Sequence, residues 1–202
     1  ADRADLIGDS DFYPVPLEAM LQKDYAKSRM RSFSFQKASK SKDLKAGKPI
    51  KIAEETTHYS IVDAAGNAVA VTTTLNGNFG SFVLVKGGGF VLNNEMDDFS
   101  AKPGSPNMYG LLGSEANSIA PRKRMLSSMT PTIVEKKGQL YMVLGTPGGS
   151  TIITSVFQVL VNMIEFRMSL EDAVQKPRFH HQWLPDVIYH EVDAFDETTI
   201  LR

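Results

Sequence analysis

The sequence predicts an α+β fold in which antiparallel strands come first and the longer helices follow. Residues 57–76 and 132–145 alternate between apolar and polar positions, and each segment reverses at a glycine-containing turn, which is typical of β-hairpins. Residues 153–164 form an apolar run behind a glycine-rich turn, as expected for a buried or amphipathic helix. This order favours layers of helix and antiparallel sheet over a parallel doubly wound fold.

The composition is that of a globular protein and excludes several function classes. The chain has 202 residues, of which 42% are hydrophobic and 22% are charged, which suits one domain or a domain with an extension. The net charge of -1 gives no bulk attraction to nucleic acid or to an anionic membrane, and the longest apolar run is too short to span a bilayer. The absence of cysteine excludes disulfides, thiolate metal sites and cysteine nucleophiles.

Both ends are interpreted as cuts through a longer protein. The first residues lack the basic and apolar regions of a signal peptide, and the last residues, DETTILR, resemble the start of a helix. Part of any active site is therefore expected to lie outside this chain.

The N-terminal part predicts one helix and one long loop. Residues 15–33 space their apolar side chains as a helix does, with Pro16 in the first turn. Residues 34–55 are rich in lysine and serine and have no apolar period, which favours a mobile loop. A nucleic-acid patch is the weaker interpretation of this basic run, because no aromatic residues are interleaved with the lysines.

The remaining elements follow from local turn and cap signals. Residues 87–99 predict a short strand followed by an acidic cluster, and residues 100–131 predict a long loop, which in a compact domain is usually functional or disordered. The second hairpin is expected to turn at Lys137-Gly138. A short helix is expected after Ser169, with that serine as the N-cap and Asp172 at the third position.

Four groups of residues have the composition of possible sites. Gly148 and Gly149 lead from a strand into a helix, where unpaired backbone N–H groups can stabilise an oxyanion, although a turn needed only for packing is the alternative. Glu95, Asp97 and Asp98 can bind a cation or an ammonium group, or form a solvated acidic turn.

The serine and histidine pairs carry weaker signals. Ser127 and Ser128 do not lie in a G-x-S-x-G elbow, so serine nucleophilic catalysis has little support. His180 and His181 are adjacent, and adjacent side chains of an extended segment point to opposite faces, so we interpret them as structural rather than as metal ligands.

Thr56 stands between the loop and the first hairpin, where chain cleavage would give it a chemical role. A threonine hydroxyl is a poor nucleophile unless a base lies beside it, and the α-amine of an N-terminal threonine is such a base. This amine has a pKa of about 7.7–8, so a useful fraction is neutral near pH 7. The alternative is that threonine simply favours the start of a strand.

Five blocks of the chain form a pattern that is too long to arise by chance, and they are TTHYSIVDAAGNAVAVTTTLN, LNNEMDDFSAKPGSPNMYGL, RKRMLSSMTPTIV, GTPGGSTIITSVFQVLVN and PRFHHQWLP. Together, and in this order, they resemble the small subunit of gamma-glutamyltranspeptidase, and the segment before Thr56 resembles the tail of that family's large subunit. The resemblance implies an N-terminal nucleophile hydrolase with an αββα sandwich. It divides the chain into residues 1–55, the end of the large subunit with a flexible loop before the cleavage site, and residues 56–202, a C-terminally truncated small subunit.

The resemblance also assigns roles to individual residues. It implies that the bond between Glu55 and Thr56 is cleaved, that Thr56 is the nucleophile and that the hydroxyl of Thr74 supports it. Asn76, Glu95 and Asp98 match the residues that hold the α-amino group of the γ-glutamyl unit. At position 95 some family members carry glutamine, which also accepts a hydrogen bond from an ammonium.

The remaining roles concern the carboxylate, the oxyanion and the lid. Ser127 and Ser128 match the pair that contacts the substrate carboxylate, Gly148 and Gly149 match the oxyanion hole, and Tyr109 lies in the segment that matches the lid loop. The family's carboxylate-clamping arginine belongs to the large subunit and has no match here, since Arg122 and Arg124 occupy other positions.

The implied activity is transfer or hydrolysis of the γ-glutamyl group of glutathione and related compounds, through an ester on Thr56. Water, an amino acid or a peptide accepts the group, the rest of the large subunit is the protein partner, and neither a metal nor an organic cofactor is implied. A related acylase, a poly-γ-glutamate depolymerase and an inert proenzyme fragment are the alternatives. The resemblance implies a periplasmic or secreted location.

Overall fold

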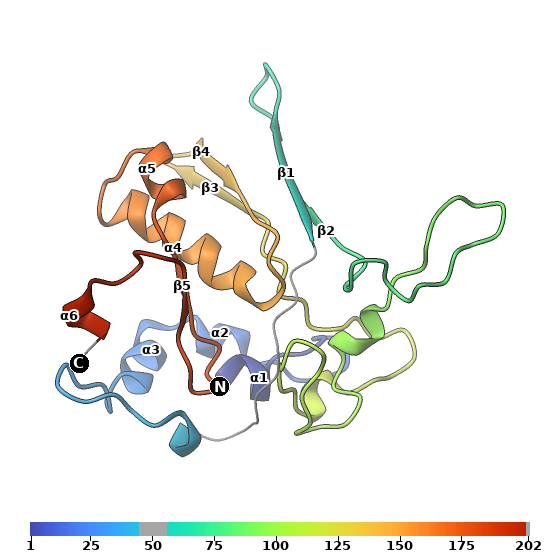
Figure 1. The fold of residues 1–202 in the computed structure, drawn as a ribbon, viewed down its shortest axis with the longest axis horizontal. Coiled ribbons are helices and arrows are strands. Elements are labelled where there is room, and N and C mark those ends of the chain that lie inside the picture. Colours follow the sequence, from blue (N-terminus) through green and yellow to red (C-terminus); the bar gives the residue numbers. More distant parts are fainter. Residues whose placement is uncertain (45–55, 201–202) are drawn as a thin grey trace. The chain divides into compact units, whose positions relative to one another are not determined.

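The computed structural model describes residues 1–44 and 56–200, which fold into two compact units (Figure 1). Among these, the first unit comprises the residues within Ala1–Lys51, Met96–Ser127 and Trp183–Asp186. The second unit comprises those within Ile52–Glu95, Ser128–Gln182 and Val187–Arg202. Among the described residues, the first unit draws on sequence from both sides of Thr56, whereas the second unit draws only on Thr56 and the residues after it. The division of the covalent chain at residue 55 stays a prediction.

The first unit begins with three short helices, α1 (Asp2–Leu6), α2 (Leu17–Met20) and α3 (Lys23–Arg29). The single helix predicted for residues 15–33 is wrong, because the chain is interrupted at Gln22, whose backbone is extended. Leu21 is 74% exposed. A continuous helix here would bury little apolar surface, and short helices depend on such burial for their stability.

Long-range polar contacts tie these helices to each other and to the later segments of the first unit. The Tyr25 hydroxyl donates to Asp2 over 2.9 Å, and Arg29 forms an ion pair with the same carboxylate at 2.8 Å. The 3-10 helix η1 (Ser41–Leu44) presents the Ser41 carbonyl to the indole N–H of Trp183, over 3.1 Å.

The long loop predicted for residues 100–131 is confirmed. It contains only the 3-10 helix η3 (Glu115–Asn117) and isolated bridge pairs, and it is preceded by η2 (Glu95–Asp98), which carries the acidic cluster. The loop is nevertheless packed, because Tyr109, Leu112 and Ala116 are buried.

Two antiparallel hairpins form the longer strands of the second unit. β1 (Thr57–Val62) pairs with β2 (Ala68–Thr73), and β3 (Thr132–Lys136) pairs with β4 (Gln139–Leu144), as the alternation predicts. The second hairpin turns at Lys137 and Gly138, which both have positive φ angles, so this prediction is confirmed.

The short strand predicted within residues 87–99 is wrong. Leu84 and Val91 form one isolated antiparallel bridge. Gly87 and Gly89 turn the chain at positive φ between them, and Leu84 and Phe90 remain more than half exposed. The segment therefore lacks the buried face that would stabilise a longer strand.

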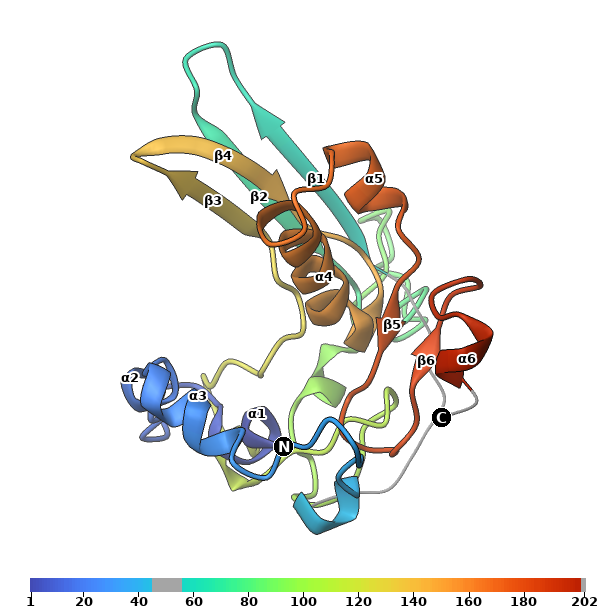
Figure 2. The same cartoon turned by 90° about the vertical axis from the view of Figure 1, so that its left-hand side faces the viewer.

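Helix α4 (Ile152–Ile164) is the longest element of the second unit and lies beside the β3–β4 hairpin in both views (Figures 1 and 2). It follows the glycine-rich turn, as predicted, and buries Ile152 and Val156. The next helix, α5 (Leu170–Gln175), has the predicted cap, in which the Ser169 hydroxyl accepts from the Asp172 N–H over 3.1 Å.

Two short strands and a last helix complete the second unit. β5 (Phe179–His180) pairs with β6 (Tyr189–His190), and α6 (Glu197–Ile200) follows where the sequence indicates a helix start. The side-chain amide of Gln158 in α4 donates to the Phe179 carbonyl over 2.7 Å and accepts from its N–H over 3.1 Å. No helix within the described ranges has the length and apolar character that crossing a membrane requires.

Candidate active site

The first hairpin places the two candidate threonines opposite each other. Thr56 directly precedes β1 and Thr74 directly follows β2, and the register pairs their neighbours Thr57 and Thr73. The Thr56 hydroxyl donates to the Thr74 hydroxyl over 3.4 Å. These four threonines and the segment after Thr74 line a pocket of about 270 Å³. Antiparallel pairing thus converts a distance of 18 positions in the sequence into direct contact.

The turn after β2 is fixed by side-chain amides. Asn76 is buried, adopts a positive φ of 72° and donates its backbone N–H to the Thr74 hydroxyl over 2.9 Å. Its amide donates to the Asn94 carbonyl over 3.2 Å, while the Asn94 amide oxygen accepts from the Gly77 N–H over 2.9 Å. Asn94 was not singled out in the sequence. It holds the Thr74 turn beside the chain that enters Glu95.

Glu95 is the carboxylate of the acidic cluster that belongs to the second unit. Its N–H donates to the Asn93 amide oxygen over 3.0 Å, which fixes the start of η2. Partial burial raises the pKa of the Glu95 carboxyl above its ordinary value.

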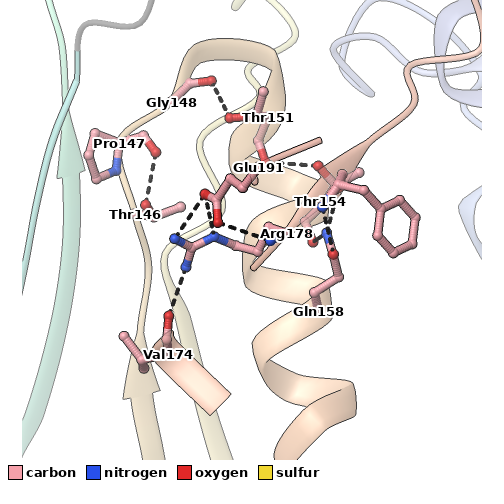
Figure 3. Close-up of polar contacts among 10 residues, drawn as sticks. Thr146, Pro147, Gly148, Thr151, Thr154, Gln158, Val174, Arg178 and Glu191 are labelled. Carbon is pink, nitrogen blue, oxygen red and sulfur yellow. Dashed lines mark hydrogen bonds and ion pairs between the residues drawn. The ribbon is translucent and has the colours of Figure 1, made fainter. Parts of the chain in front are cut away.

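Gly148 and Gly149 both have positive φ angles and form the turn that leads into α4, and Gly148 is shown in Figure 3. Gly148 has a φ of 135°, and its carbonyl accepts from the N–H and the hydroxyl of Thr151 over 2.9 Å and 2.8 Å. A Cβ on Gly148 would lie 2.5 Å from the Thr151 hydroxyl, so a side chain is excluded on grounds of both conformation and space. Neither glycine is among the described residues that line the threonine pocket.

Side-chain hydrogen bonds and an ion pair join α4, α5 and the β5–β6 pair. Arg178 pairs with Glu191 at 3.1 Å and donates to the Val174 carbonyl, which joins β5, β6 and α5 (Figure 3). His180 is buried, with its two ring nitrogens 2.8 Å from the Thr154 hydroxyl and 3.0 Å from the Gln182 amide oxygen, while His181 is exposed. Within residues 1–44 and 56–200, no group of three or more acidic or histidine side chains is placed to hold a metal ion.

Three further predicted site residues lie in the first unit. Asp98 is half-buried at the end of η2, Ser127 is exposed, and Tyr109 is only 5% exposed, with its N–H bonded to the Asn107 amide oxygen over 3.0 Å. The Ser127 carbonyl accepts from Arg3 over 3.0 Å. The structure therefore divides the predicted residues between the units. Ser128 is half-buried in the second unit, and Glu55 lies outside the described residues.

Asn117 bonds Asp98 and the residue before Ser127, which the sequence did not indicate. Its side-chain amide donates to the Asp98 carbonyl over 2.8 Å and accepts from the Leu126 N–H over 3.0 Å. The segments that carry Asp98 and Ser127 are thereby tied together inside the first unit. The only local signal, an asparagine in a polar loop, is too common to identify such a role.

Comparison with known proteins defines first the class and then the family. Gamma-glutamyltranspeptidase from Pseudomonas nitroreducens, in complex with L-DON, is 57% identical and aligns over 72% of this chain and 77% of its own, with a TM-score of 0.68. A mutant of the enzyme from Helicobacter pylori is 54% identical over 70% of this chain and 76% of its own, also with a TM-score of 0.68. The chain thus has the α+β fold of the N-terminal nucleophile hydrolases.

The sequence relatives identify the family. The family model for gamma-glutamyltranspeptidase matches residues 1–201. Glutathione hydrolase proenzyme of Escherichia coli strain K12 is 53% identical over 188 residues, which cover 92% of this chain and 32% of that protein. The chain belongs to the gamma-glutamyltranspeptidase family. It spans about a third of the length of the curated relatives it matches.

Proposed function

We propose that the chain acts, as part of a longer polypeptide, in γ-glutamyl transfer and hydrolysis, with glutathione and other γ-glutamyl compounds as donors. The observation that carries this proposal is the contact between the hydroxyls of Thr56 and Thr74 at the edge of a pocket. Membership of the family supports the substrate class.

The reaction begins once cleavage after Glu55 has made Thr56 an N-terminal residue. The neutral α-amine takes the proton of the Thr56 hydroxyl, whose oxygen attacks the γ-amide carbonyl. Thr74 receives the backbone N–H of Asn76, so its oxygen is held in place, and the bond from Thr56 orients the nucleophile. The N–H groups of Gly148 and Gly149 stabilise the oxyanion in this mechanism.

Donor recognition uses the two charged groups on the α-carbon of the glutamyl unit. We assign the ammonium to Asn76, Glu95 and Asp98, since carboxylates and an amide oxygen accept its three hydrogens. The α-carboxylate is assigned to the hydroxyls of Ser127 and Ser128, and Tyr109 belongs to the lid segment. The α-ammonium of Thr56 then gives its proton to the leaving nitrogen, so collapse of the tetrahedral intermediate expels the amine and leaves the γ-glutamyl ester.

The proposal also covers the second reaction step, the protein partner and the cellular location. Water releases glutamate from the ester, or the amine of an amino acid or peptide takes up the glutamyl group. These steps use an amine, hydroxyls and backbone donors. The protein partner is the rest of the large subunit, and the relatives' designation as proenzymes supports processing into two chains. A periplasmic or secreted location is part of the proposal.

The test is processing and turnover by the full-length polypeptide and its Thr56→Ala variant. Intact mass spectrometry should detect two chains that meet at Glu55 and Thr56 in the parent and one chain in the variant. The parent should release the amine from a γ-glutamyl anilide. Equal or faster turnover of an acyl anilide that lacks the α-amino group would instead support an acylase, and an uncut, inactive parent would support an inert proenzyme.

A further inference from the structure

We propose that Asn117 is a positioning residue for donor recognition, which fixes the spacing between Asp98 and Ser127. This inference rests on the proposed function, in which those residues bind the ammonium and the carboxylate of one glutamyl unit. Both charged groups sit on the same carbon atom of the donor. Their partners on the protein must therefore be held at one separation if both are to bind at once.

The Asn117 side chain is a direct link between the two segments. It is 4% exposed, and its NH₂ group donates to the Asp98 carbonyl over 2.8 Å. Its oxygen accepts from the N–H of Leu126, the residue before Ser127, over 3.0 Å. One amide thus sets the distance between the backbones of the two segments.

The backbone of Asn117 holds the same place. Its carbonyl accepts from the Ser100 N–H over 2.9 Å, two residues beyond Asp98, and its N–H donates to the Ser114 carbonyl over 3.2 Å. Ser114 also caps η3, because its hydroxyl accepts from the Ala116 N–H and donates to the Asp5 carbonyl over 2.8 Å. Asn117 is therefore presented from a rigid support.

The η3 backbone that carries Asn117 has no room to shift toward Gly8. Ala116 is fully buried, and a Cβ on Gly8 would overlap the Ala116 carbonyl. A packed backbone of this kind transmits a change of side chain at position 117 to the segments it bonds, rather than absorbing it.

The chemistry of the link requires an amide of this length. The Asp98 carbonyl needs a donor and the Leu126 N–H needs an acceptor, and the asparagine side chain supplies both on the same carbon atom. A carboxylate supplies only acceptors, and alanine supplies neither. Loss of the link leaves two part-buried backbone groups without this partner, which favours movement of the segments apart.

Other contacts should keep the segment around Ser127 folded when the link is lost. Arg124 bonds Asp9 through its backbone N–H and its guanidinium, and Arg3 bonds the Ser127 carbonyl. Arg124 ties the segment to residues 1–44, and Arg3 lies close enough to Asp98 for their charges to attract, which adds a second tie between the two segments. Removal of the Asn117 side chain therefore loosens the spacing of the two backbones while the segment stays attached.

The test compares how glutamate and its two single-group analogues bind the processed full-length enzyme. L-glutamate, glutarate (no α-amine) and 4-aminobutanoate (no α-carboxylate) serve as competitive inhibitors of γ-glutamyl anilide hydrolysis. The parent should bind L-glutamate much more tightly than either analogue. In Asn117→Ala this advantage should fall roughly tenfold or more, while the inhibition constants of the analogues change little.

Two further variants keep the result interpretable. Ser41→Ala removes a buried hydroxyl that donates to Asp186 over 2.6 Å in the same unit, and should leave the advantage of glutamate unchanged. Asn117→Asp keeps the acceptor for Leu126 but cannot donate to the Asp98 carbonyl while ionised. It should lose the advantage at pH 7 and serves in place of the alanine variant if that one does not fold.

The outcomes separate this inference from the proposed function. Equal weakening of all three inhibitors by the Asn117 variants, or no change, would overturn the positioning role while the function stands. A parent enzyme that binds glutamate no better than glutarate would overturn the proposed function, and the inference with it.

Discussion

At the residue scale, the contact between Thr56 and Thr74 predicts that removal of the Thr74 hydroxyl slows catalysis even though the nucleophile itself remains. In Thr74→Val the fold of β2 should persist, because valine has the same shape and favours strands. The variant lacks the hydroxyl that accepts from Thr56 and from the Asn76 N–H. We expect kcat for γ-glutamyl anilide hydrolysis to fall on the order of a hundredfold, whereas Thr74→Ser should retain most of it. Equal activity in both variants would show that the hydroxyl has no part in catalysis.

Glu95 gives a second prediction at this scale, on pH dependence. Only the ionised carboxylate attracts the donor ammonium, and burial raises the pKa of Glu95, so donor affinity should decline already at mildly acidic pH. KM for the γ-glutamyl anilide should therefore rise as pH falls, and this rise should begin at a pH above the ordinary glutamate pKa of about 4.3. The Glu95→Gln side chain does not titrate, so this variant should lack the rise of KM at acidic pH. An unchanged KM–pH profile in that variant would assign the titration to another group.

The raised pKa of Glu95 has the opposite effect on folding stability, which it favours at low pH rather than at high pH. A raised pKa means that the folded protein holds this proton more tightly than the unfolded chain does. The contribution of Glu95 to stability is therefore present at low pH and lost as pH rises through the raised pKa. Recognition of an ammonium and stability thus make opposing demands on this residue.

Individual residues also mark the limit of prediction from the sequence. Thr56 is indicated by its position before a strand and Asn76 by the family resemblance, but nothing in the sequence indicates Asn94, Asn117 or Asp9. Each of these acts through a hydrogen bond to a residue at least 17 positions away in the sequence. Single-sequence reasoning sees spacing and composition, and contacts of this kind depend on how the loops pack.

At the scale of elements, turn and cap chemistry was predictable while helix continuity was not. The hairpin at Lys137-Gly138 and the cap at Ser169 are set by neighbours in sequence, and both predictions are confirmed. Helix α1 and the break at Gln22 were missed. In these cases the outcome depends on tertiary contacts such as the Asp2 carboxylate between Tyr25 and Arg29.

Gly145, just after β4, carries the prediction that belongs to this scale. A Cβ there would lie 2.3 Å from the His58 ring of β1, and that ring is held by the hydroxyls of Thr72 and Ser60. Gly145→Ala should lower the free energy of unfolding by roughly 1–3 kcal/mol, because the ring cannot move aside without breaking these bonds. Urea denaturation of the full-length protein measures this.

A double variant identifies the cause. His58→Ser removes the ring, so Gly145→Ala should cost much less when introduced into that background. An equal loss of stability in both backgrounds would place the cause in the backbone of Gly145 instead.

At the scale of the whole molecule, the predicted cleavage would leave two polypeptides that only non-covalent contacts hold together. Residues on the N-terminal side of Thr56 bond residues on its C-terminal side within the first unit. Arg124 contacts Asp9 through its backbone N–H at 2.9 Å and its guanidinium at 2.5 Å, and it also pairs with Asp11. The Asp9 side chain is 1% exposed, so the charge is enclosed by its partners. After cleavage these bonds become contacts between two polypeptides.

The pair should therefore control how firmly the two chains stay together. The hydrogen bonds from Arg124 hold the pKa of Asp9 far below its ordinary value. A depressed pKa means that the stabilisation is present above the ordinary aspartate pKa, and is lost only as pH falls through the depressed one. Size-exclusion chromatography of the cleaved protein should find the chains associated at pH 4. Asp9→Asn leaves Arg124 without its buried partner charge, so dissociation should begin at lower urea concentration.

The matched control for this prediction is Asp24→Asn. Asp24 also pairs with a cation, Lys27, but both side chains are largely exposed, and such pairs contribute little because water screens them. It should leave the urea concentration at which the chains separate unchanged. Equal behaviour of the Asp9 and Asp24 variants would mean that apolar packing alone holds the cleaved chains together. A difference confined to Asp9→Asn would mean that one buried carboxylate, provided by the segment before the cleavage site, keeps the proposed carboxylate-binding loop attached after the covalent link is gone.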